Sequence, residues 1–442
     1  MADSKLPSIQ LSEFTQRQLD SDVIDFSAGQ PGPRLLPLDM VAAGAAHRFT
    51  GAAADPYILQ YGTVQGYSSF RHCLAAFLSD ATQHKVDPDE LLITAGVSHG
   101  LDLACRLLAS PGDAVLVEAP TYFLAGDILR QAGLTLVPVP TCDDGLDVDA
   151  LEVMLQQQQS PRPKLLYTIP IHNNPAGTTI PLAKRQQLLR LAHRHDFTIV
   201  ADEVYQLLSF PDSPEPPPPM KVVEQQMLQQ GLLDGLASSS SSSSSSSQDA
   251  NGGSISNGAG GSSGSQPQGC ERVVSMGSFS KIMAPGMRLG WMEAAPSLLQ
   301  QLCRDGVLNS GGSIAPLASG IAHSCLELGL LQQHLHQVIR PSLAAGCTAV
   351  CEALRREMPR CSFQQPLGGY FVWVQLPQVC AEELLQLAEA KHRVRFVPGR
   401  ACQGLRHMVR LSFSFYRPDE LQQGVARLAA ALDDYLGGER AA

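Results

Sequence analysis

A lysine flanked by a serine and an arginine is the most informative feature of the chain. The segment Ser278-Phe-Ser-Lys281 follows a short apolar run, and Arg288 comes seven residues after the lysine. A lysine amine can form a Schiff base with an aldehyde, while a serine hydroxyl and a guanidinium suit a phosphate group. The segment fits the binding of a phosphorylated aldehyde. Taken alone, a lysine in a loop is more often a solvated surface charge.

A carboxylate and a tyrosine stand directly after a second apolar run, Thr198–Val200. At the carboxyl end of a strand, Asp202 is placed to pair with a protonated ring nitrogen. Tyr205, three residues later, can turn its hydroxyl toward the same ring. The alternative for Asp202 is an ordinary cap of the turn or helix that follows.

An asparagine turn follows a third apolar run. In Pro170-Ile-His-Asn-Asn-Pro-Ala-Gly177, the prolines and the glycine favour a rigid turn, from which the Asn174 amide can donate to an anionic oxygen. Such a turn has low specificity by itself. His172 has no adjacent acid or metal partner in the sequence, so we expect it to be incidental, and no metal site is predicted.

In this chain order, the three motifs resemble the class I/II pyridoxal-phosphate aminotransferases of fold type I, including the kynurenine/2-aminoadipate aminotransferase branch. The resemblance extends from about Ile24 to Leu432. It implies pyridoxal 5'-phosphate as the cofactor and transfer of the amino group of an L-amino acid to a 2-oxo acid such as 2-oxoglutarate.

The resemblance also implies a role for each matching residue around the cofactor. Lys281 is expected to be the Schiff-base lysine and Asp202 the partner of the pyridine nitrogen. The other expected cofactor contacts are Tyr205 and Asn174 at the phenolic oxygen, Tyr122 stacked on the ring, and Val97, Ser98, Ser278 and Arg288 at the phosphate. Val97 stands where the family often has serine. One hydroxyl contact is then lost, but the backbone N–H at a helix start remains.

Three further residues are implied around the substrate and at a subunit boundary. Arg410 matches the arginine for the substrate α-carboxylate, which a guanidinium binds with two hydrogen bonds. Gly29, with Asn174, is expected to approach the substrate. Tyr61 resembles the tyrosine that reaches the phosphate of a neighbouring subunit, which implies a homodimer with shared active sites. Arg395 and Arg400 lie close to Arg410 in the sequence and are alternative candidates for the same role.

The elements that must position these residues form an α/β pattern. Short apolar runs alternate with amphipathic segments such as Leu101–Leu108 and Lys184–His193, as in a parallel sheet covered by helices. The expected strands are Leu91–Thr94, Ala114–Val117, Leu134–Val137, Leu165–Thr168, Thr198–Val200 and Arg272–Met276. Their continuous apolar character predicts burial on both faces, with ligands at the carboxyl ends of the strands.

Three regions are predicted along the chain. Residues 1–48 form an N-terminal segment that contributes to the small domain and the active site. Residues 49–318 form the large cofactor-binding α/β domain, and 319–442 a smaller C-terminal α+β domain. Within the large domain, residues 213–268 are rich in Pro, Ser and Gly, and we expect a disordered surface insertion there.

Composition excludes several classes of protein. The formal net charge is -10, from 42 acidic and 32 basic residues, which disfavours nucleic acid as a partner. No apolar run approaches the roughly 20 residues that would span a bilayer, so no membrane partner is expected. The 11 cysteines are scattered and odd in number, as in a reducing compartment. The first residues lack the pattern of a secretory signal, and we expect a cytoplasmic protein, although an organelle signal could escape this test.

Several alternatives remain open at the level of sequence. The same scaffold and lysine serve carbon–sulfur β-lyases and 1-aminocyclopropane-1-carboxylate synthase-like enzymes. A transcription regulator built on this fold is disfavoured, because the roughly 20 residues before the match are too few for a DNA-binding module. The preferred amino acid is not readable from the motifs. The resemblance leans toward broad specificity for 2-aminoadipate, aromatic or aliphatic amino acids.

Overall fold

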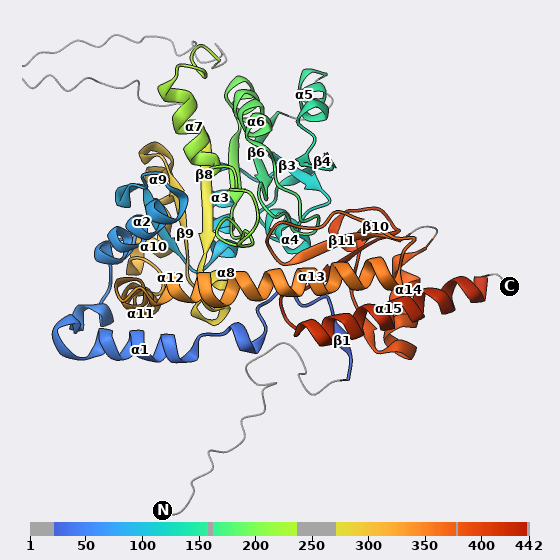
Figure 1. The fold of residues 1–442 in the computed structure, drawn as a ribbon. Helices are drawn as coiled ribbons and strands as arrows, with labels where there is room; N and C mark the ends of the chain where they lie inside the picture. Colours follow the sequence, from blue (N-terminus) through green and yellow to red (C-terminus); the bar gives the residue numbers. More distant parts are fainter. Residues whose placement is uncertain (1–21, 158–161, 237–270, 377–378, 440–442) are drawn as a thin grey trace, which may run out of the picture.

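The larger of two main sheets has eight strands in the order β2-β9-β8-β7-β6-β3-β4-β5 (Figure 1). The computed structural model describes residues 22–157, 162–236, 271–376 and 379–439. The strands of this sheet are β2 (Leu91–Thr94), β3 (Ala114–Ala119), β4 (Thr135–Cys142), β5 (Gly145–Leu146), β6 (Pro163–Thr168), β7 (Thr198–Asp202), β8 (Val273–Ser278) and β9 (Gly290–Ala294). From β8 through β4 all neighbours are parallel, whereas β9 is antiparallel to β8 and β2, and β5 to β4. The predicted mostly parallel sheet is confirmed.

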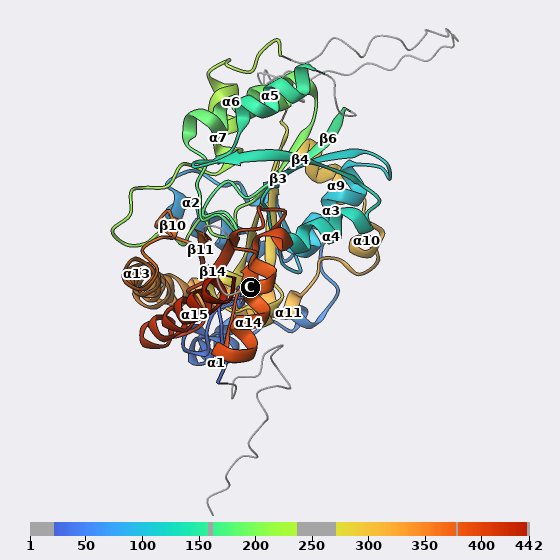
Figure 2. The same cartoon turned by 90° about the vertical axis from the view of Figure 1, so that its right-hand side faces the viewer.

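Helices cover both faces of this sheet (Figure 2). Successive side chains of a strand point to opposite faces, and the strands use both sets of positions. Val115 and Val117 pack into one hydrophobic cluster with α3 and α4, while Leu116 packs into another with α5, α6 and α7. The helices of this region are α2 (Ser68–Thr82), α3 (Val97–Leu108), α4 (Phe123–Gln131), α5 (Val148–Gln156), α6 (Leu182–His195), α7 (Met220–Gln229), α8 (Phe279–Ile282), α9 (Pro296–Leu302) and α10 (Gly306–Gly311).

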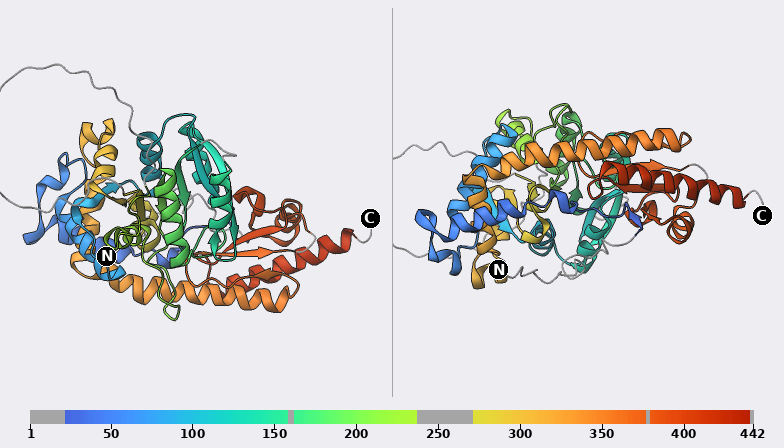
Figure 3. Two further views of the ribbon diagram at one scale, coloured as in Figure 1. Left: turned by 90° about the horizontal axis from the view of Figure 1, so that it is seen from above. Right: turned by 60° about the horizontal axis from the view of Figure 1, so that its bottom comes forward.

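A second, four-stranded antiparallel sheet has the order β10-β11-β14-β13. It is formed by β10 (Ser362–Phe363), β11 (Phe371–Gln375), β13 (Val397–Pro398) and β14 (Met408–Ser412), while β1 (Ile24–Asp25) pairs with β12 (Val394–Arg395). The accompanying helices are α1 (Leu38–Phe49), α11 (Pro316–Glu327), α12 (Leu330–His334), α13 (Arg340–Glu357), α14 (Ala381–His392) and α15 (Pro418–Glu439). α13 and α15 lie side by side (Figure 3).

Shorter helical turns join these elements. They are 33–35, 51–53, 56–59, 88–90, 285–287 and 399–402, together with the π-helical stretch Leu335–Ile339 that leads from α12 into α13. Among the described residues, no helix is long and apolar enough to cross a membrane. The predicted domain limits at 48/49 and 318/319 fall inside α1 and α11, so neither limit coincides with a connection between elements.

The prediction of a disordered insertion over residues 213–268 is wrong for its first part. Residues 220–229 form α7, whose Met220, Val223 and Met227 are buried against the large sheet. These three residues recur at helical spacing, which lets one face of α7 enter the core. The preceding prolines and the following serine run concealed this short helix in the sequence. Residues 237–268 lie outside the described residues.

Candidate functional site

A cavity of about 540 Å³ opens where the parallel strands of the large sheet end, facing the small sheet. This is the edge of an open α/β sheet at which ligands bind. Eleven of the twelve site residues predicted from the sequence line it. They are Gly29, Val97, Ser98, Tyr122, Asn174, Asp202, Tyr205, Ser278, Lys281, Arg288 and Arg410. Residues at or just after the ends of five strands of the large sheet (β2, β3, β6, β7 and β8) and residues of the small sheet thus converge on one space.

One end of the cavity is formed by the start of α3. Val97 and Ser98 occupy the first turn, where backbone N–H groups have no partner within the helix. Gly96 precedes them with φ +80°, and a Cβ at this position would lie 3.4 Å from Nη2 of Arg288. Arg288 donates from Nη2 to the carbonyl oxygen of Ala95 at 3.2 Å. Two N–H donors and a guanidinium therefore gather at a helix N-terminus, an arrangement that suits a phosphate.

Asp202 lies deep in the cavity, at the end of β7. Its Oδ2 accepts a hydrogen bond from the Tyr167 hydroxyl at 2.7 Å. Its Oδ1 is buried and has no hydrogen-bond partner among the described residues. Burial raises the pKa of Asp202 to about 6, and the bond from Tyr167 opposes that shift. A buried carboxylate oxygen without a donor is costly, so this position suits a ligand that brings a donor with it.

Lys281 lies on α8 and lines the same cavity as Asp202. Its Nζ donates to the carbonyl oxygen of Gly29 at 2.9 Å and lies 5.2 Å from the centre of the Tyr370 ring. Burial lowers the pKa of Lys281 to about 8, although the charge of Asp202 opposes that shift. At this pKa about one fifth of the amine is neutral near pH 7.4, far more than for an exposed lysine with a pKa of about 10.4, and the neutral amine is the form that attacks an aldehyde.

Aromatic side chains enclose the middle of the cavity. Tyr205 is buried, with its ring 5.5 Å from that of Tyr370 and 6.2 Å from that of Phe371. Tyr122, at the N-cap position of α4, also lines the cavity. Burial raises the pKa of both tyrosine hydroxyls, so both stay protonated and able to donate.

Arg410 enters the cavity from β14 of the small sheet. Its Nη1 donates to Oδ1 of Asn174 at 2.8 Å and its Nη2 to the carbonyl oxygen of Ser27 at 2.9 Å. The guanidinium carbon lies 4.2 Å from the centre of the Phe371 ring. Each Nη atom is thus held by a protein partner, and because each carries two N–H groups, the guanidinium can in addition bind a carboxylate at two points.

The segment Ser27–Gln30 closes this side of the cavity and is held by β14. The Ser412 hydroxyl donates to the carbonyl oxygen of Ala28 at 2.7 Å, and that of Ser414 to the carbonyl oxygen of Gln30 at 2.8 Å. Arg410 and Ser412 alternate along β14 and so face the same side of the strand, while the Ser414 hydroxyl, two residues beyond the strand, lies 3.1 Å from that of Ser412. The position of Gly29 is therefore set by the small sheet.

Tyr61 is the one predicted site residue that the cavity does not include. Its side chain is 81% exposed, so the structure does not bring it to the site of its own chain. The two alternative candidates for the role of Arg410 also lie elsewhere: Arg395 pairs with Glu389, and Arg400 lies 3.9 Å from Glu382. His172 is buried beside Ser209, burial lowers its pKa to about 3, and it lines no part of the cavity.

Sequence reasoning missed several residues of the site. Tyr167 binds Asp202, and Phe123, Phe371 and Gln30 line the cavity. The sequence held no signal for Tyr167, because its approach to Asp202 depends on the register of β6 against β7, in which Tyr167 pairs with Val200, two residues before Asp202. Phe371 and Gln30 had no signal either, since their place depends on how the two sheets pack.

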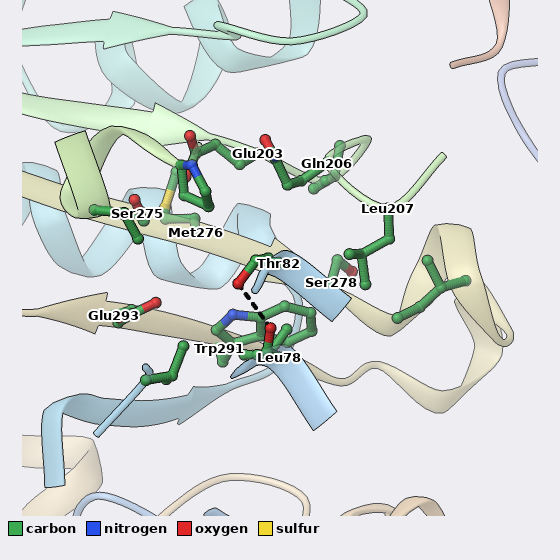
Figure 4. Close-up of a pocket in the computed structure, with 16 residues that line it drawn as sticks. Leu78, Thr82, Glu203, Gln206, Leu207, Ser275, Met276, Ser278, Trp291 and Glu293 are labelled. Carbon is green, nitrogen blue, oxygen red and sulfur yellow. Dashed lines mark hydrogen bonds between the residues drawn. The ribbon is translucent and has the colours of Figure 1, made fainter. Parts of the chain in front are cut away.

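A second, smaller hollow lies behind β8 and is lined by Leu78, Trp291, Glu203, Ser275 and Glu293, among others (Figure 4). Its volume is about 40 Å³, room for roughly three water molecules. It shares Ser278 and Val204 with the larger cavity but is too small for a cofactor.

The large cavity fits a phosphorylated pyridine aldehyde on three independent observations. Oδ1 of Asp202 needs a donor, as a protonated ring nitrogen would supply. Lys281 presents an amine of lowered pKa. The start of α3 with Arg288 forms an anion site at another edge of the same cavity. When bound, such a group supplies an aldehyde for amines and a ring that withdraws electrons.

Comparison with known proteins gives one consistent result. Residues 21–428 match the family described as aminotransferase class I and II. The aromatic-amino-acid aminotransferase 1 of Thermococcus litoralis is 30% identical, over 94% of this chain and 89% of its own. The 2-aminoadipate transaminase of Thermus thermophilus is also 30% identical, over 97% and 94%.

Solved structures agree with the sequence comparison. The kynurenine aminotransferase of Pyrococcus horikoshii, solved in complex with PMP, is 28% identical and superposes with a TM-score of 0.78, over 98% of this chain and 96% of its own. The family match over nearly the whole chain and this structural similarity agree on both the fold and the cofactor. The chain belongs to the class I and II aminotransferases, and it is an enzyme that uses pyridoxal 5'-phosphate.

Proposed function

We propose that the 540 Å³ cavity is the active site, and that it moves the amino group of an L-amino acid with an aromatic, aliphatic or 2-aminoadipate side chain to a 2-oxo acid such as 2-oxoglutarate. The observation that carries the proposal is the placement of Asp202 Oδ1, Lys281 Nζ and the Arg410 fork around one cavity. The names of the relatives support these substrate classes.

Each predicted residue then has a task in this cavity. Arg410 holds the substrate α-carboxylate and so turns the amino group toward Lys281. Lys281 Nζ would take the proton from the substrate Cα and deliver it to the cofactor carbon on the other side of the substrate nitrogen. Asp202 Oδ1 keeps the ring nitrogen protonated. Tyr205 and Asn174 donate to the phenolic oxygen, Tyr122 stacks on the ring, and Val97, Ser98, Ser278 and Arg288 hold the phosphate.

Gly29 is proposed to contact the substrate through its backbone. A Cβ at this position would lie 3.1 Å from the ring of Phe371, which is tighter than most carbon contacts. The absence of a side chain lets the Ser27–Gln30 segment lie close to Arg410 and Phe371, so this edge of the substrate space is narrow.

We also propose a homodimer in which Tyr61 completes the partner's site. Tyr61 is 81% exposed and follows two other exposed apolar side chains in the chain, Tyr57 and Leu59, which are 77% and 73% exposed. Exposed apolar side chains that gather on a surface are typical of an interaction site. Tyr61→Phe is expected to weaken cofactor binding while leaving the sedimentation coefficient of the protein unchanged, since only the hydroxyl is lost.

A cytoplasmic location is proposed on the chemistry of the thiols. The ten cysteines within the described ranges are all free, and the closest pair, Cys347 and Cys351, keeps its sulfur atoms 3.9 Å apart. Free buried thiols are typical of reducing compartments. The division into residues 1–48, 49–318 and 319–442 stays a prediction.

The test of the proposed function is amino transfer by the purified protein. A panel of amino donors with 2-oxoglutarate should yield glutamate and the matching 2-oxo acid. Lys281→Ala should abolish turnover and the visible absorbance of the bound cofactor, whereas Lys391→Ala, an exposed lysine on α14, should change neither. Pyruvate and ammonia formed without any acceptor would instead identify a β-lyase, and a cyclopropane product the synthase.

A further inference from the structure

Glu118 is a fully buried carboxylate that none of the roles above uses. It is the penultimate residue of β3. Its Oε1 accepts from the Thr168 hydroxyl at 2.9 Å, and its Oε2 accepts from the backbone N–H of Ile169 at 3.0 Å and from Nδ2 of Asn173 at 2.9 Å. Among the described residues it forms no ion pair within 4.0 Å. Such a group is tolerated in a core only because donors satisfy it.

The three donors all belong to the end of β6 and the turn that follows it. Ile169 lines the active-site cavity, and Asn173 directly precedes Asn174. Asn173 links Glu118 to the rest of the turn, because its Oδ1 accepts from the N–H of Ala176 at 3.1 Å. Its carbonyl oxygen also accepts from the N–H of Gly177 at 2.7 Å. Glu118 thus holds one side of the turn that presents Asn174.

Glu118 also lies close in the chain to a second wall of the cavity. Four residues after it, Tyr122 directly precedes α4 at the N-cap position, and it lines the cavity together with Tyr205. β3 and β6 are parallel neighbours, with Val117 opposite Tyr167. The carboxylate therefore bridges the two strand ends from which Tyr122 and Asn174 are presented, and it does so from inside the protein, without contact with the cavity itself.

We propose that Glu118 is a positioning residue for amino transfer, which fixes the turn of Asn174 relative to Tyr122 so that the Asn174 amide meets both the cofactor and Arg410. This inference rests on the proposed function of the cavity. Its structural basis is the direct chain of contacts from Glu118 to Asn173, through the peptide bond to Asn174, and from Oδ1 of Asn174 to Nη1 of Arg410.

The hydrogen-bond pattern predicts which substitutions preserve this role. In Glu118→Gln, the amide oxygen can take the place of Oε2 and accept from Ile169 and Asn173, while the NH₂ group donates to the Thr168 hydroxyl, which can accept. In Glu118→Ala, the Ile169 N–H and Asn173 Nδ2 lose their acceptor and a void remains. Asn173→Ala breaks only the link to the turn.

The chain offers a matched control in Glu224 on α7. Glu224 is also fully buried, and its carboxylate accepts from the N–H of Arg272 at 2.6 Å and of Val273 at 3.2 Å, with His193 at 2.8 Å. It ties α7 and α6 to the start of β8, the end of that strand away from the cavity. Glu224→Ala removes an equally satisfied buried carboxylate without touching the active site.

The experiment measures three quantities for each variant: the thermal midpoint of the apoprotein, the Kd for pyridoxal phosphate by absorbance titration, and KM against kcat for one amino donor. Glu118→Ala is expected to raise both the Kd and the KM by about tenfold, the equivalent of one lost hydrogen bond to a charged group. Asn173→Ala should also raise the Kd and the KM. The double variant should have a Kd and a KM no higher than those of Glu118→Ala, because both changes break the same link. Glu118→Gln should have values close to those of the wild type.

Glu224→Ala should lower the thermal midpoint and leave the Kd and KM unchanged. If Glu118→Ala behaves in the same way, Glu118 is only a structural residue and the proposal is wrong. If Glu118→Ala does not fold, an unchanged Kd and KM in folded Asn173→Ala overturns the proposal equally. The cofactor titration does not depend on turnover. If the wild-type protein failed to transaminate, the proposed function would be wrong, but the Kd for pyridoxal phosphate would still test the role of Glu118.

Discussion

The Tyr167 hydroxyl donates to Oδ2 of Asp202 at 2.7 Å, from one parallel strand to the next. Both side chains are buried, so the bond is not exchanged for water. It favours the ionised form of a carboxylate whose pKa burial raises. The tyrosine therefore keeps Asp202 charged in surroundings that work against its charge.

Tyr167→Phe is expected to move the acidic limb of the pH–rate profile to higher pH. Loss of the donor raises the pKa of Asp202 from about 6 by about one further unit, so kcat/KM should fall about tenfold well below pH 6 and about twofold near pH 7. The measurement is kcat/KM between pH 5 and 9. Tyr435→Phe, on α15 away from the cavity, serves as the control, and a profile identical to wild type in Tyr167→Phe would contradict the expectation.

Cofactor capture by the apoprotein should depend on pH through Lys281. Since burial lowers the pKa of its amine to about 8, the rate of capture should rise with pH and level off above about that value. Asp202→Asn removes a charge that raises this pKa, so the midpoint should shift to lower pH. Stopped-flow absorbance with pyridoxal phosphate measures both midpoints. A midpoint near that of an exposed lysine, about 10.4, would refute the burial argument.

Arg410→Lys is expected to raise the KM for amino donors by at least about tenfold, with a smaller effect on kcat. The lysine ammonium cannot reproduce the two-point geometry that Asn174 and Ser27 impose on the guanidinium. Steady-state kinetics with one donor at varied concentration give the split between KM and kcat. Arg400→Lys, outside the cavity, should match wild type.

Gly96→Ala is expected to weaken cofactor binding through the backbone. At φ +80° and ψ 175° an alanine is strained, by about 1–3 kcal/mol, and its Cβ would press on Arg288 at the same site. Apoprotein titration and thermal unfolding measure the two effects. Gly286→Ala is the control, because a Cβ there meets nothing within 4 Å. Equal affinity in both variants would show that the start of α3 does not hold the phosphate.

Met227→Ala is expected to lower the free energy of unfolding by about 2–5 kcal/mol, because Met227 of α7 is 1% exposed. Urea unfolding measures the loss, and Gln229→Ala, at an exposed position of the same helix, should have almost no effect. Cofactor affinity should stay unchanged in both. A neutral result for Met227→Ala would mean that α7 is not part of the core.

The motifs at the strand ends were predictable because apolar runs mark the strands, and parallel strands put their carboxyl ends at one edge. Lys281, Asp202 and Asn174 lie in the cavity for this reason, whereas Arg410, which the family resemblance identified, reaches it from the middle of β14 in the small sheet. Tyr167 and Glu118 were not identified, since their partners are 35 and about 50 residues away and depend on the register of β3, β6 and β7.

Other features of the structure were missed for reasons other than strand register. α7 is a ten-residue helix between a proline run and a serine run, and composition averaged over that window conceals its apolar face. Phe371 reaches the cavity only because the small sheet packs against the large one. No pattern within a single strand carries that information.

Buried side chains from both sheets belong to one hydrophobic cluster. It includes Ile93 and Phe279 from the part of the chain before α11 and Tyr370 and Leu428 from the part after α13. If the backbone were cut between α11 and α13, each fragment would expose apolar surface that the other now covers. Lys281 would leave with the first fragment and Arg410 with the second. Two co-expressed fragments should therefore regain transamination only by reassociating, which makes this connection a natural place to install a split-enzyme reporter.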